Sequence, residues 1–185
     1  MIVSAMTKDA SVTSDDETRP ERHLVAVDGF DDFFAEHHDR IVRSLCLVLG
    51  DVHLGRDAAS EGFARALQRW GRVGSYENPA GWIYRVGLNW ARSRRRRTVR
   101  EIPEFSASES RSSDGAVAAE TSDRDLRILP ALRRLSVDHR AVVVARYYLD
   151  YSEQQIATAL DIRPGTVKSR LSRALERLAD DLGTA

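Results

Sequence analysis

Arginine and aromatic side chains are concentrated in one short stretch of the sequence, NPAGWIYRVGLNWARSRRRR, which spans residues 78–97. The planar guanidinium group can donate two hydrogen bonds to one phosphate. Lysine occurs only at Lys8 and Lys168, a bias that suits phosphate contacts and that a GC-rich genome would also produce. The density of arginine predicts a phosphate-binding surface, although cations also favour the C-terminal end of any helix.

The chain has no net charge, yet its charges are unevenly distributed. The net charge is −2 over residues 1–27, +4 over 28–100, −5 over 101–125 and +3 over 126–185. Two basic segments therefore flank an acidic one. The first and third segments are polar and lack an apolar period, so we predict a disordered N-terminal tail and a flexible acidic linker.

Apolar residues in both basic segments recur every three or four positions, as amphipathic helices require. The first helix is expected to begin at Phe30 and to end at Gly50. A second helix is expected over residues 56–69, followed by a loop that contains Gly71 and Gly74. No segment competes as a strand, so we predict an all-α fold of two small helical domains.

The arginine-rich stretch is expected to open with a helix start at Asn78 and Pro79, because asparagine caps free N–H groups and proline fits the first turn. The apolar face of this helix should pack in the core and consists of Trp82, Ile83, Val86 and Trp90. The arginines of residues 92–100 then extend beyond that core.

The C-terminal segment has the pattern of a helix-turn-helix. Ser152 can cap a first helix, residues 161–165 form the turn, and a second helix starts at Thr166. The apolar residues of the second helix lie within one arc and should face the core: Val167, Leu171, Ala174, Leu175 and Leu178.

The rest of this second helix carries hydroxyl and cationic side chains: Thr166, Lys168, Ser169, Arg170, Ser172 and Arg173. Such a face suits the major groove of DNA and its phosphates. An ordinary solvated helix face can have the same composition, so the pattern alone leaves both interpretations open.

Other reactive residues form no recognisable catalytic or metal site. His37 and His38 point about 100° apart on a helix, and no third ligand lies at a useful spacing. Cys46 is the only cysteine, which excludes an internal disulfide, and its apolar neighbours predict a buried thiol. Without a nucleotide-binding loop, a nucleophile motif, a signal peptide or an apolar membrane span, we expect a cytoplasmic protein that is neither an enzyme nor dependent on a cofactor.

The stretch LDYSEQQIATALDIRPGTVKSRLSRALERL resembles region 4 of bacterial sigma factors of the extracytoplasmic-function (ECF) type. Related helix-turn-helix domains occur in response regulators, which would carry a phosphoacceptor domain. Here the N-terminal block contains FDDFFAEHHDRIVRSLCLVLGD, then DAASEGFARALQRW, then the arginine-rich stretch, and it is similar to region 2 in order and spacing. The resemblance covers residues 28–100 and 126–182.

The resemblance implies a sigma factor that binds core RNA polymerase and directs promoter-specific transcription initiation. Region 2 would occupy residues 28–100 and region 4 residues 126–185. Region 4 would read the duplex −35 element through the polar face that starts at Thr166. The resemblance further implies an anti-sigma partner and a linker that passes through the polymerase.

Region 2 would melt the −10 element and capture its non-template strand, which requires a surface for an unstacked base beside cations. The resemblance places the base-capturing loop at Gly71 to Asn78. The implied −10 contacts are Tyr76, Asn78, Asn89, Arg92, Arg94, Arg95, Arg96 and Arg97. Trp82 and Trp90 are expected in the core, which leaves Tyr76 as the better stacking candidate.

The segment 57–69 resembles the helix that docks on the polymerase clamp. Its charged residues could pair across that interface or with one another: Asp57, Glu61, Arg65 and Arg69. The chain departs from the family at Ala58, Ala59 and Ser60, where larger aliphatics and a glutamine are common. It also departs at Ser93, where an aspartate often follows the asparagine. A helix-turn-helix regulator that does not join polymerase and a protein that binds an acidic partner remain the alternatives.

Overall fold

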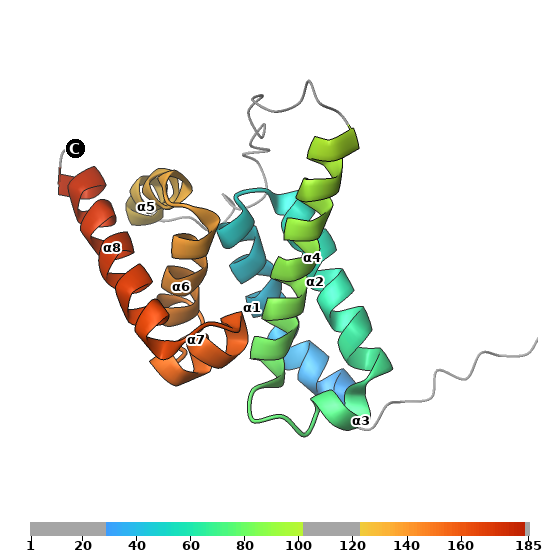
Figure 1. Cartoon of the computed structure of the whole chain (residues 1–185). Coiled ribbons are helices and arrows are strands. Elements are labelled where there is room, and N and C mark those ends of the chain that lie inside the picture. The colour runs from blue at the N-terminus through green and yellow to red at the C-terminus, as the bar shows by residue number, and fades with distance from the viewer. Residues whose placement is uncertain (1–28, 102–122, 184–185) are drawn as a thin grey trace, which may run out of the picture.

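The computed structural model describes residues 29–101 and 123–183 (Figure 1). These residues form helices and no strand, which confirms the all-α prediction. The predicted tail and residues 102–122 of the predicted linker lie outside the described residues. The helices are α1 (Phe30–Leu49), α2 (Val52–Gln68), α3 (Trp70–Val73), α4 (Pro79–Glu101), α5 (Asp123–Arg134), α6 (Val137–Tyr147), α7 (Glu153–Leu160) and α8 (Pro164–Gly183).

Capping residues define the connection between α1 and α2. Gly50 adopts a left-handed conformation with φ of 67°, and its N–H donates to the Cys46 carbonyl, so α1 ends where the sequence predicts. Helix α2 begins at Val52, four residues before its predicted start. The reason is Asp51, whose carboxylate accepts a hydrogen bond from the Leu54 N–H at 2.9 Å.

The predicted loop around Gly71 is partly helical, because α3 forms a single turn there. The Trp70 ring packs against Phe30 and Phe33, with centroids 5.1 Å and 4.9 Å apart, and Val73 is buried. These contacts fix the turn despite its glycine. The irregular segment is therefore residues 74–78, shorter than expected.

The buried face of α4 differs from the predicted one. Ile83 is buried as expected, but Trp82, Val86 and Trp90 are only half-buried. The fully buried side chains include Tyr84, which sequence analysis did not assign to the core. Helix α4 packs against α1 and α2 and also against α7, so its buried arc faces neighbours from both halves of the chain.

Helices α2 and α4 approach each other closely through small residues. A Cβ atom added to Gly87 would lie 2.8 Å from the Ala58 carbonyl oxygen, and Ala58 itself is fully buried. Any side chain at position 87 would have to move α4 away, and the complete burial of Ala58 leaves no open space for a larger aliphatic residue. The departures from the family at Ala58 and Ala59 are thus accommodated by a tight α2–α4 contact.

The C-terminal helices carry clear start and stop signals. Ser152 and Gln155 form a capping box at the start of α7, which confirms Ser152 as its cap. Asp161 ends α7 in a left-handed conformation with φ of 56°. Helix α8 starts at Pro164, two residues before the predicted start, because proline is favoured in a first turn.

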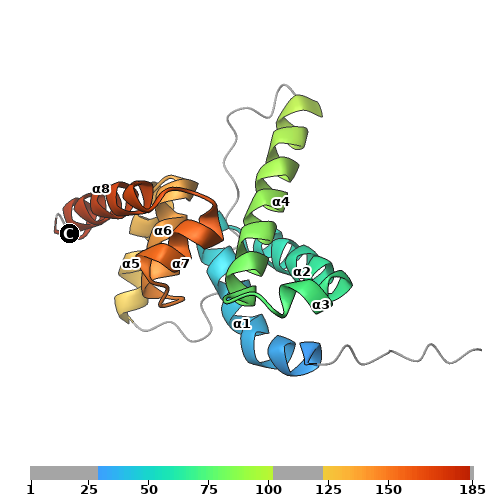
Figure 2. The ribbon, with the colours of Figure 1, turned by 60° about the horizontal axis from the view of Figure 1, so that its bottom comes forward.

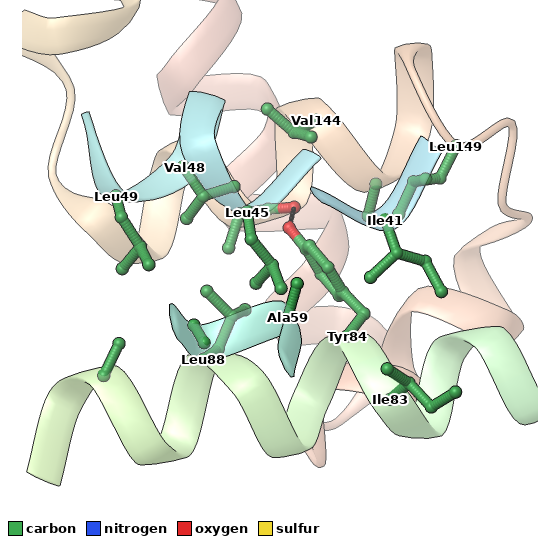
Figure 3. Packing of buried hydrophobic residues seen from close by; sticks show 14 of the residues in the cluster. Ile41, Leu45, Val48, Leu49, Ala59, Ile83, Tyr84, Leu88, Val144 and Leu149 are labelled. Carbon is green, nitrogen blue, oxygen red and sulfur yellow. Dashed lines mark hydrogen bonds between the residues drawn. The ribbon is translucent and has the colours of Figure 1, made fainter. Parts of the chain in front are cut away.

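One continuous core joins the two groups of helices. In two views, α5, α6 and α8 lie on one side of α1 and α4, and α2 lies on the other (Figures 1 and 2). Figure 3 shows Val144 and Leu149 from the C-terminal half beside Ile41, Leu45 and Tyr84 from the N-terminal half. The sequence predicts two helical units but does not indicate that they share a core.

Cys46 lies in α1 with 7% of its surface exposed, which confirms the predicted buried thiol. Its Sγ lies 3.6 Å from the Val52 carbonyl oxygen. Burial raises the pKa of the Cys46 thiol. The residue therefore acts as a small apolar core residue at the α1–α2 junction.

Candidate nucleic-acid interface

The polar side chains of α8 form a surface that we call the α8 face: Thr166, Lys168, Ser169, Arg170, Ser172 and Arg173. Val167 and Ala174 are fully buried on the opposite side and fix the rotation of the helix. Lys168, Ser169, Ser172 and Arg173 are exposed, and Thr166 and Arg170 are half-buried. The structure therefore brings the six predicted residues onto one accessible part of α8.

Local hydrogen bonds hold some of these side chains. The Ser169 hydroxyl donates to the Thr166 carbonyl at 3.2 Å, and the Ser172 hydroxyl donates to Glu176 at 2.9 Å. Both bonds lie within α8 and are solvent-exposed. They leave the face as a compact set of hydroxyl and cationic groups at the start of a helix.

The prediction that Leu175 faces the core is wrong, since 38% of its surface is exposed. Together with Tyr147, Leu178 and Leu182 it lines a groove of about 1190 Å³ between α8, α6, α5 and α1. The neighbouring helices bury only part of the apolar side of α8. Leu175 therefore lies at an open edge between helices.

The second cationic surface lies on α4 and the residues before it. We call it the α4 surface; it comprises Tyr76, Asn78, Asn89, Arg92, Arg94, Arg95, Arg96 and Arg97. Helix α4 continues through the arginine run to Glu101, so these guanidinium groups are distributed around a helix. Asn89 and Arg97 are exposed.

Several of these arginines contact groups within the N-terminal half. Arg94 lies 5.2 Å from the Trp90 ring centroid and 3.5 Å from the Asp57 carboxylate. Arg95 donates to the Leu49 carbonyl at 3.2 Å, which is one of the carbonyl groups at the end of α1. Arg94 and Arg95 thus fasten α4 to α2 and α1 while their outer surfaces remain exposed.

Arg92 connects the α4 surface to the C-terminal half. Its guanidinium group is hydrogen-bonded to Asp138 at the start of α6. The other oxygen of Asp138 lies 3.0 Å from Arg170 of the α8 face. One carboxylate therefore lies between a cation of each predicted DNA-binding surface.

The loop before α4 also contacts the C-terminal half. Asn78 caps α4 by accepting a hydrogen bond from the Gly81 N–H at 2.7 Å, as its sequence position predicts. Its side chain is also hydrogen-bonded to Tyr151. Burial raises the pKa of Tyr151, whereas this bond and the positive charge of Arg40 lower it. Tyr76, predicted to stack on a base, is half-buried and packs against the shared core.

The charged residues of α2 pair mainly within the chain. Arg65 and Glu61 form an ion pair at 2.6 Å, one helical turn apart. Asp57 lies beside Arg94, and Arg69 is exposed at the end of α2. The sequence left open whether these residues pair with one another or across an interface; in the structure Glu61 pairs with Arg65, and Asp57 pairs instead with Arg94 of α4.

Three residues important to the arrangement were missed from the sequence. Tyr84 donates a hydrogen bond to the Ala141 carbonyl at 3.1 Å, and Asp138 binds two arginines. Arg140 is buried, and burial followed by the charges of Arg95 and Arg133 lowers its pKa. An acidic residue in a first helical turn is a visible signal, but its long-range partners depend on three converging helices.

Other kinds of site are not evident in the described part of the chain. Within residues 29–101 and 123–183, no group of His, Cys, Asp and Glu side chains is arranged to hold a metal ion. None of the helices described is both long and apolar enough to cross a membrane. The two cationic surfaces are therefore the features that call for a functional explanation.

The helix-turn-helix of α7 and α8, its exposed polar face and the arginine-rich α4 define an all-helical DNA-binding protein. A family model described as "Sigma-70, region 4" matches residues 125–178. The ECF RNA polymerase sigma factor SigL of Mycobacterium tuberculosis strain H37Rv is 37% identical over 158 residues, which cover 81% of this chain and 88% of SigL. The chain belongs to the ECF RNA polymerase sigma factor family.

Further relatives extend over both groups of helices. RNA polymerase sigma factor CarQ of Myxococcus xanthus is 29% identical over 85% of this chain and 91% of its own length. The RNA polymerase sigma-E factor of Streptomyces coelicolor is 30% identical over 83% and 85%. A solved structure of the Bartonella quintana sigma factor RpoE in complex with the anti-sigma factor NepR matches with a TM-score of 0.63 and 23% identity, covering 83% of this chain and 98% of that one. That last match supports the fold.

Proposed function

We propose that this protein binds core RNA polymerase in the cytoplasm and directs promoter-specific transcription initiation. The observation that carries the proposal is the pairing of the exposed α8 face with an arginine-rich α4 in a chain that spans 88% of SigL. The protein supplies promoter recognition, and catalysis belongs to the polymerase. This role accounts for both cationic surfaces with one activity.

Residues 126–185 act as region 4 and read the duplex −35 element. The α8 face enters the major groove, where Arg173 and Lys168 can reach base edges and phosphates. Ser169, Ser172 and Thr166 provide hydroxyl groups for the same groove and its backbone. The exposed side chains of this face support the assignment.

Residues 28–100 act as region 2 and capture the melted −10 strand. Arg92 and Arg94 to Arg97 hold the strand's phosphates, while Asn89, Asn78 and Tyr76 meet an unstacked base. Helix α2 docks on the polymerase through its exposed charged side, which includes Asp57, Glu61, Arg65 and Arg69. The pairs these residues form within the chain can be exchanged, because exposed ion pairs contribute little to stability.

Gel filtration of the purified chain with core RNA polymerase tests this function, with a housekeeping sigma factor as competitor. We expect stoichiometric co-elution that the competitor reduces, followed by initiation from selected genomic fragments. A chain that binds duplex DNA and never co-elutes with polymerase would instead be a conventional helix-turn-helix regulator. Similarity to sigma factors over more than four-fifths of the chain favours the first outcome.

Regulation by an anti-sigma protein is part of the proposal. The structure of RpoE with NepR shows that a fold of this kind can be bound by such a partner. For this chain, the groove between α1, α6 and α8 has apolar lining that includes Val42, Leu175 and Leu178. Reduced co-elution with polymerase in the presence of a candidate anti-sigma protein would identify it.

A further inference from the structure

Two members of the α4 surface are engaged by the C-terminal half of the same chain, and a third lies beside them. Arg92 is paired with Asp138, and Asn78 is hydrogen-bonded to Tyr151. Tyr76, close to Asn78 in the chain, is half-buried against a core cluster that contains residues of both halves. One proposed phosphate contact, Arg92, and one proposed base contact, Asn78, are therefore already bound by α6 and by the segment before α7.

Asp138 occupies a special place in this arrangement because it is bound from two sides. Arg92 reaches it from α4 and Arg170 reaches it from α8, at 3.0 Å for the second pair. The side chain of Asp138 is 45% exposed, and those of Arg92 and Arg170 are 34% and 27% exposed. The carboxylate thus takes a position between two cations that a phosphate could otherwise occupy.

Buried contacts reinforce this ion-pair triad. The Tyr84 hydroxyl donates to the Ala141 carbonyl at 3.1 Å, with the ring completely buried (Figure 3). Leu149 and Ile156 are buried in the same cluster as residues of α1 and α4. At the other edge, Arg40 donates to the Tyr148 carbonyl at 2.9 Å and pairs with Asp150 at 2.7 Å. The two halves are therefore joined by both buried and exposed contacts from α1 and α4.

The α8 face, unlike the α4 surface, makes few contacts with other helices. Lys168, Ser169 and Arg173 are exposed, and only Arg170 of the six residues is paired with a residue from another helix among the described contacts. Duplex DNA can therefore approach most of this face without separation of the halves. A single strand cannot reach Tyr76, Asn78 and Arg92 together unless α6 and α7 move.

We propose that the chain by itself adopts a closed, self-masking arrangement in which Asp138 acts as an internal substitute for DNA phosphate and withholds the strand-capture part of the α4 surface. This inference rests on the proposed function, because it takes α4 as the strand-binding element. Separation of the halves releases Arg92 and Arg170 together. Promoter melting by the free protein is thereby disfavoured, whereas duplex contact is largely retained.

The closed arrangement should lower the affinity of the free chain for a single strand. If only a small fraction of the chain is open, the apparent affinity for a single strand is reduced by that fraction. Removing the charge of Asp138 weakens two partly exposed ion pairs, which should shift the equilibrium by about 5-fold. The apparent affinity for a single strand should rise by the same factor.

The test measures fluorescence anisotropy of a labelled oligothymidine strand and of a mixed-sequence duplex of the same length, without polymerase. Asp138→Asn removes the shared carboxylate, and Tyr84→Phe removes the buried hydrogen bond without touching a cation. Glu153→Gln is the matched control, because it removes one exposed negative charge from the same half. Small-angle X-ray scattering of each protein reports whether the halves have separated.

We expect Asp138→Asn and Tyr84→Phe each to raise strand affinity about 5-fold, with a change of less than about 2-fold for the duplex. Glu153→Gln should change neither by more than about 2-fold. Equal gains for strand and duplex, or gains matched by Glu153→Gln, would overturn the inference. So would scattering that shows an extended wild-type chain.

Co-elution with core RNA polymerase separates this inference from the proposed function. Wild-type protein that binds polymerase while Asp138→Asn gains no strand affinity leaves the function intact and removes the masking. A selective gain in strand affinity without polymerase binding by any variant supports the masking and refutes the sigma assignment. The masking and the sigma function can therefore be refuted separately.

Discussion

The two cationic surfaces of this protein differ in how much of their chemistry is already used within the chain. On α4, Arg92, Arg94 and Arg95 contact Asp138, Asp57 and the Leu49 carbonyl. On α8, Lys168 and Arg173 are exposed in the first half of the helix. A surface that reads duplex DNA can stay exposed at all times. A surface that captures a melted strand needs free cations only after the DNA has melted.

This difference also separates two kinds of interaction energy. The ion pairs of α4 are partly exposed, so exchanging a carboxylate for a phosphate costs little. The Tyr84 ring and its hydrogen bond to Ala141 are buried, so breaking that contact costs more. The buried Tyr84 contact therefore contributes most of the energy that holds the two halves together. The ion pairs determine which arginines are unavailable to DNA.

The largest effect is expected from Tyr84→Ala, which removes a fully buried ring from the shared core. We expect the free energy of unfolding to fall by about 3–5 kcal/mol, because the cavity adds to the lost burial. Tyr84→Phe keeps the ring and should cost about 1 kcal/mol. Chemical denaturation measures both. If Tyr84→Ala costs no more than Tyr84→Phe, the ring is not buried in solution and the halves do not share a core.

Replacing Arg94 to Arg97 by glutamine should have the next largest effect. Each lost phosphate contact reduces the slope of log affinity against log salt by about 0.7 for a single strand. We expect strand affinity on the polymerase to fall about 100-fold and open-complex formation to become less sensitive to salt. Replacing Arg56 and Arg177, which are exposed on other helices, is the control for overall charge. An unchanged salt slope would assign the arginine run to helix packing alone.

Arg173→Ala tests the other surface. Its exposed guanidinium group should contribute about 1–3 kcal/mol to binding of duplex promoter DNA, or roughly 10–100-fold in affinity. Polymerase binding should not change, because α2 lies in the other half. Electrophoretic mobility shift and co-elution measure the two affinities, with Arg177→Ala further along α8 as the control. Equal losses of duplex and polymerase binding would contradict this division of labour.

Alkaline pH should weaken the join between the halves. Burial raises the pKa of Tyr84, as does Tyr151, while Arg92 opposes the shift. An exposed tyrosine ionises near pH 10, so the folded state retains the Tyr84 proton that the unfolded state loses above that pH. Stability should therefore be unaffected below about pH 10 and should fall by up to about 1.4 kcal/mol per pH unit above it.

Tyr84→Phe provides the control for this pH dependence, since phenylalanine has no proton to lose. Denaturation between about pH 9 and pH 11 should show a steeper decline for the wild type than for the variant. Parallel declines would mean that Tyr84 reaches solvent without unfolding. Tyr151 remains in both proteins and accounts for part of the residual slope.

The sequence predicted local features better than long-range ones. The end of α1 at Gly50, the Ser152 cap and the Asn78 cap follow from short-range hydrogen bonding and were predicted correctly. The wrong assignments arose where packing decided. Aromatic contacts made the glycine-containing turn at α3 helical, and neighbouring helices bury Tyr84 of α4 instead of Val86. Leu175 lies at the edge of the apolar arc of α8, beyond the helices that cover the rest of it.

The candidate site shows the same limit. Periodicity placed the six residues of the α8 face together, because one helix positions all of them. It could not pair Asp138 with Arg92, which is 46 positions away, or Tyr84 with Ala141 at a separation of 57. Those contacts require the relative placement of two halves that are joined through an acidic segment without an apolar period.

The smallest stability effect is expected for Glu61→Gln on α2, and it distinguishes internal pairing from docking. The Glu61–Arg65 pair spans one helical turn with side chains 32% and 49% exposed, so its loss should cost no more than about 0.5 kcal/mol of stability. If the same carboxylate meets polymerase, affinity measured by competition with a housekeeping sigma factor should fall about 5-fold or more. Ser60→Ala, on the neighbouring exposed position, is the control. A change in neither quantity would leave Glu61 as a solvated residue and move the docking surface elsewhere on α2.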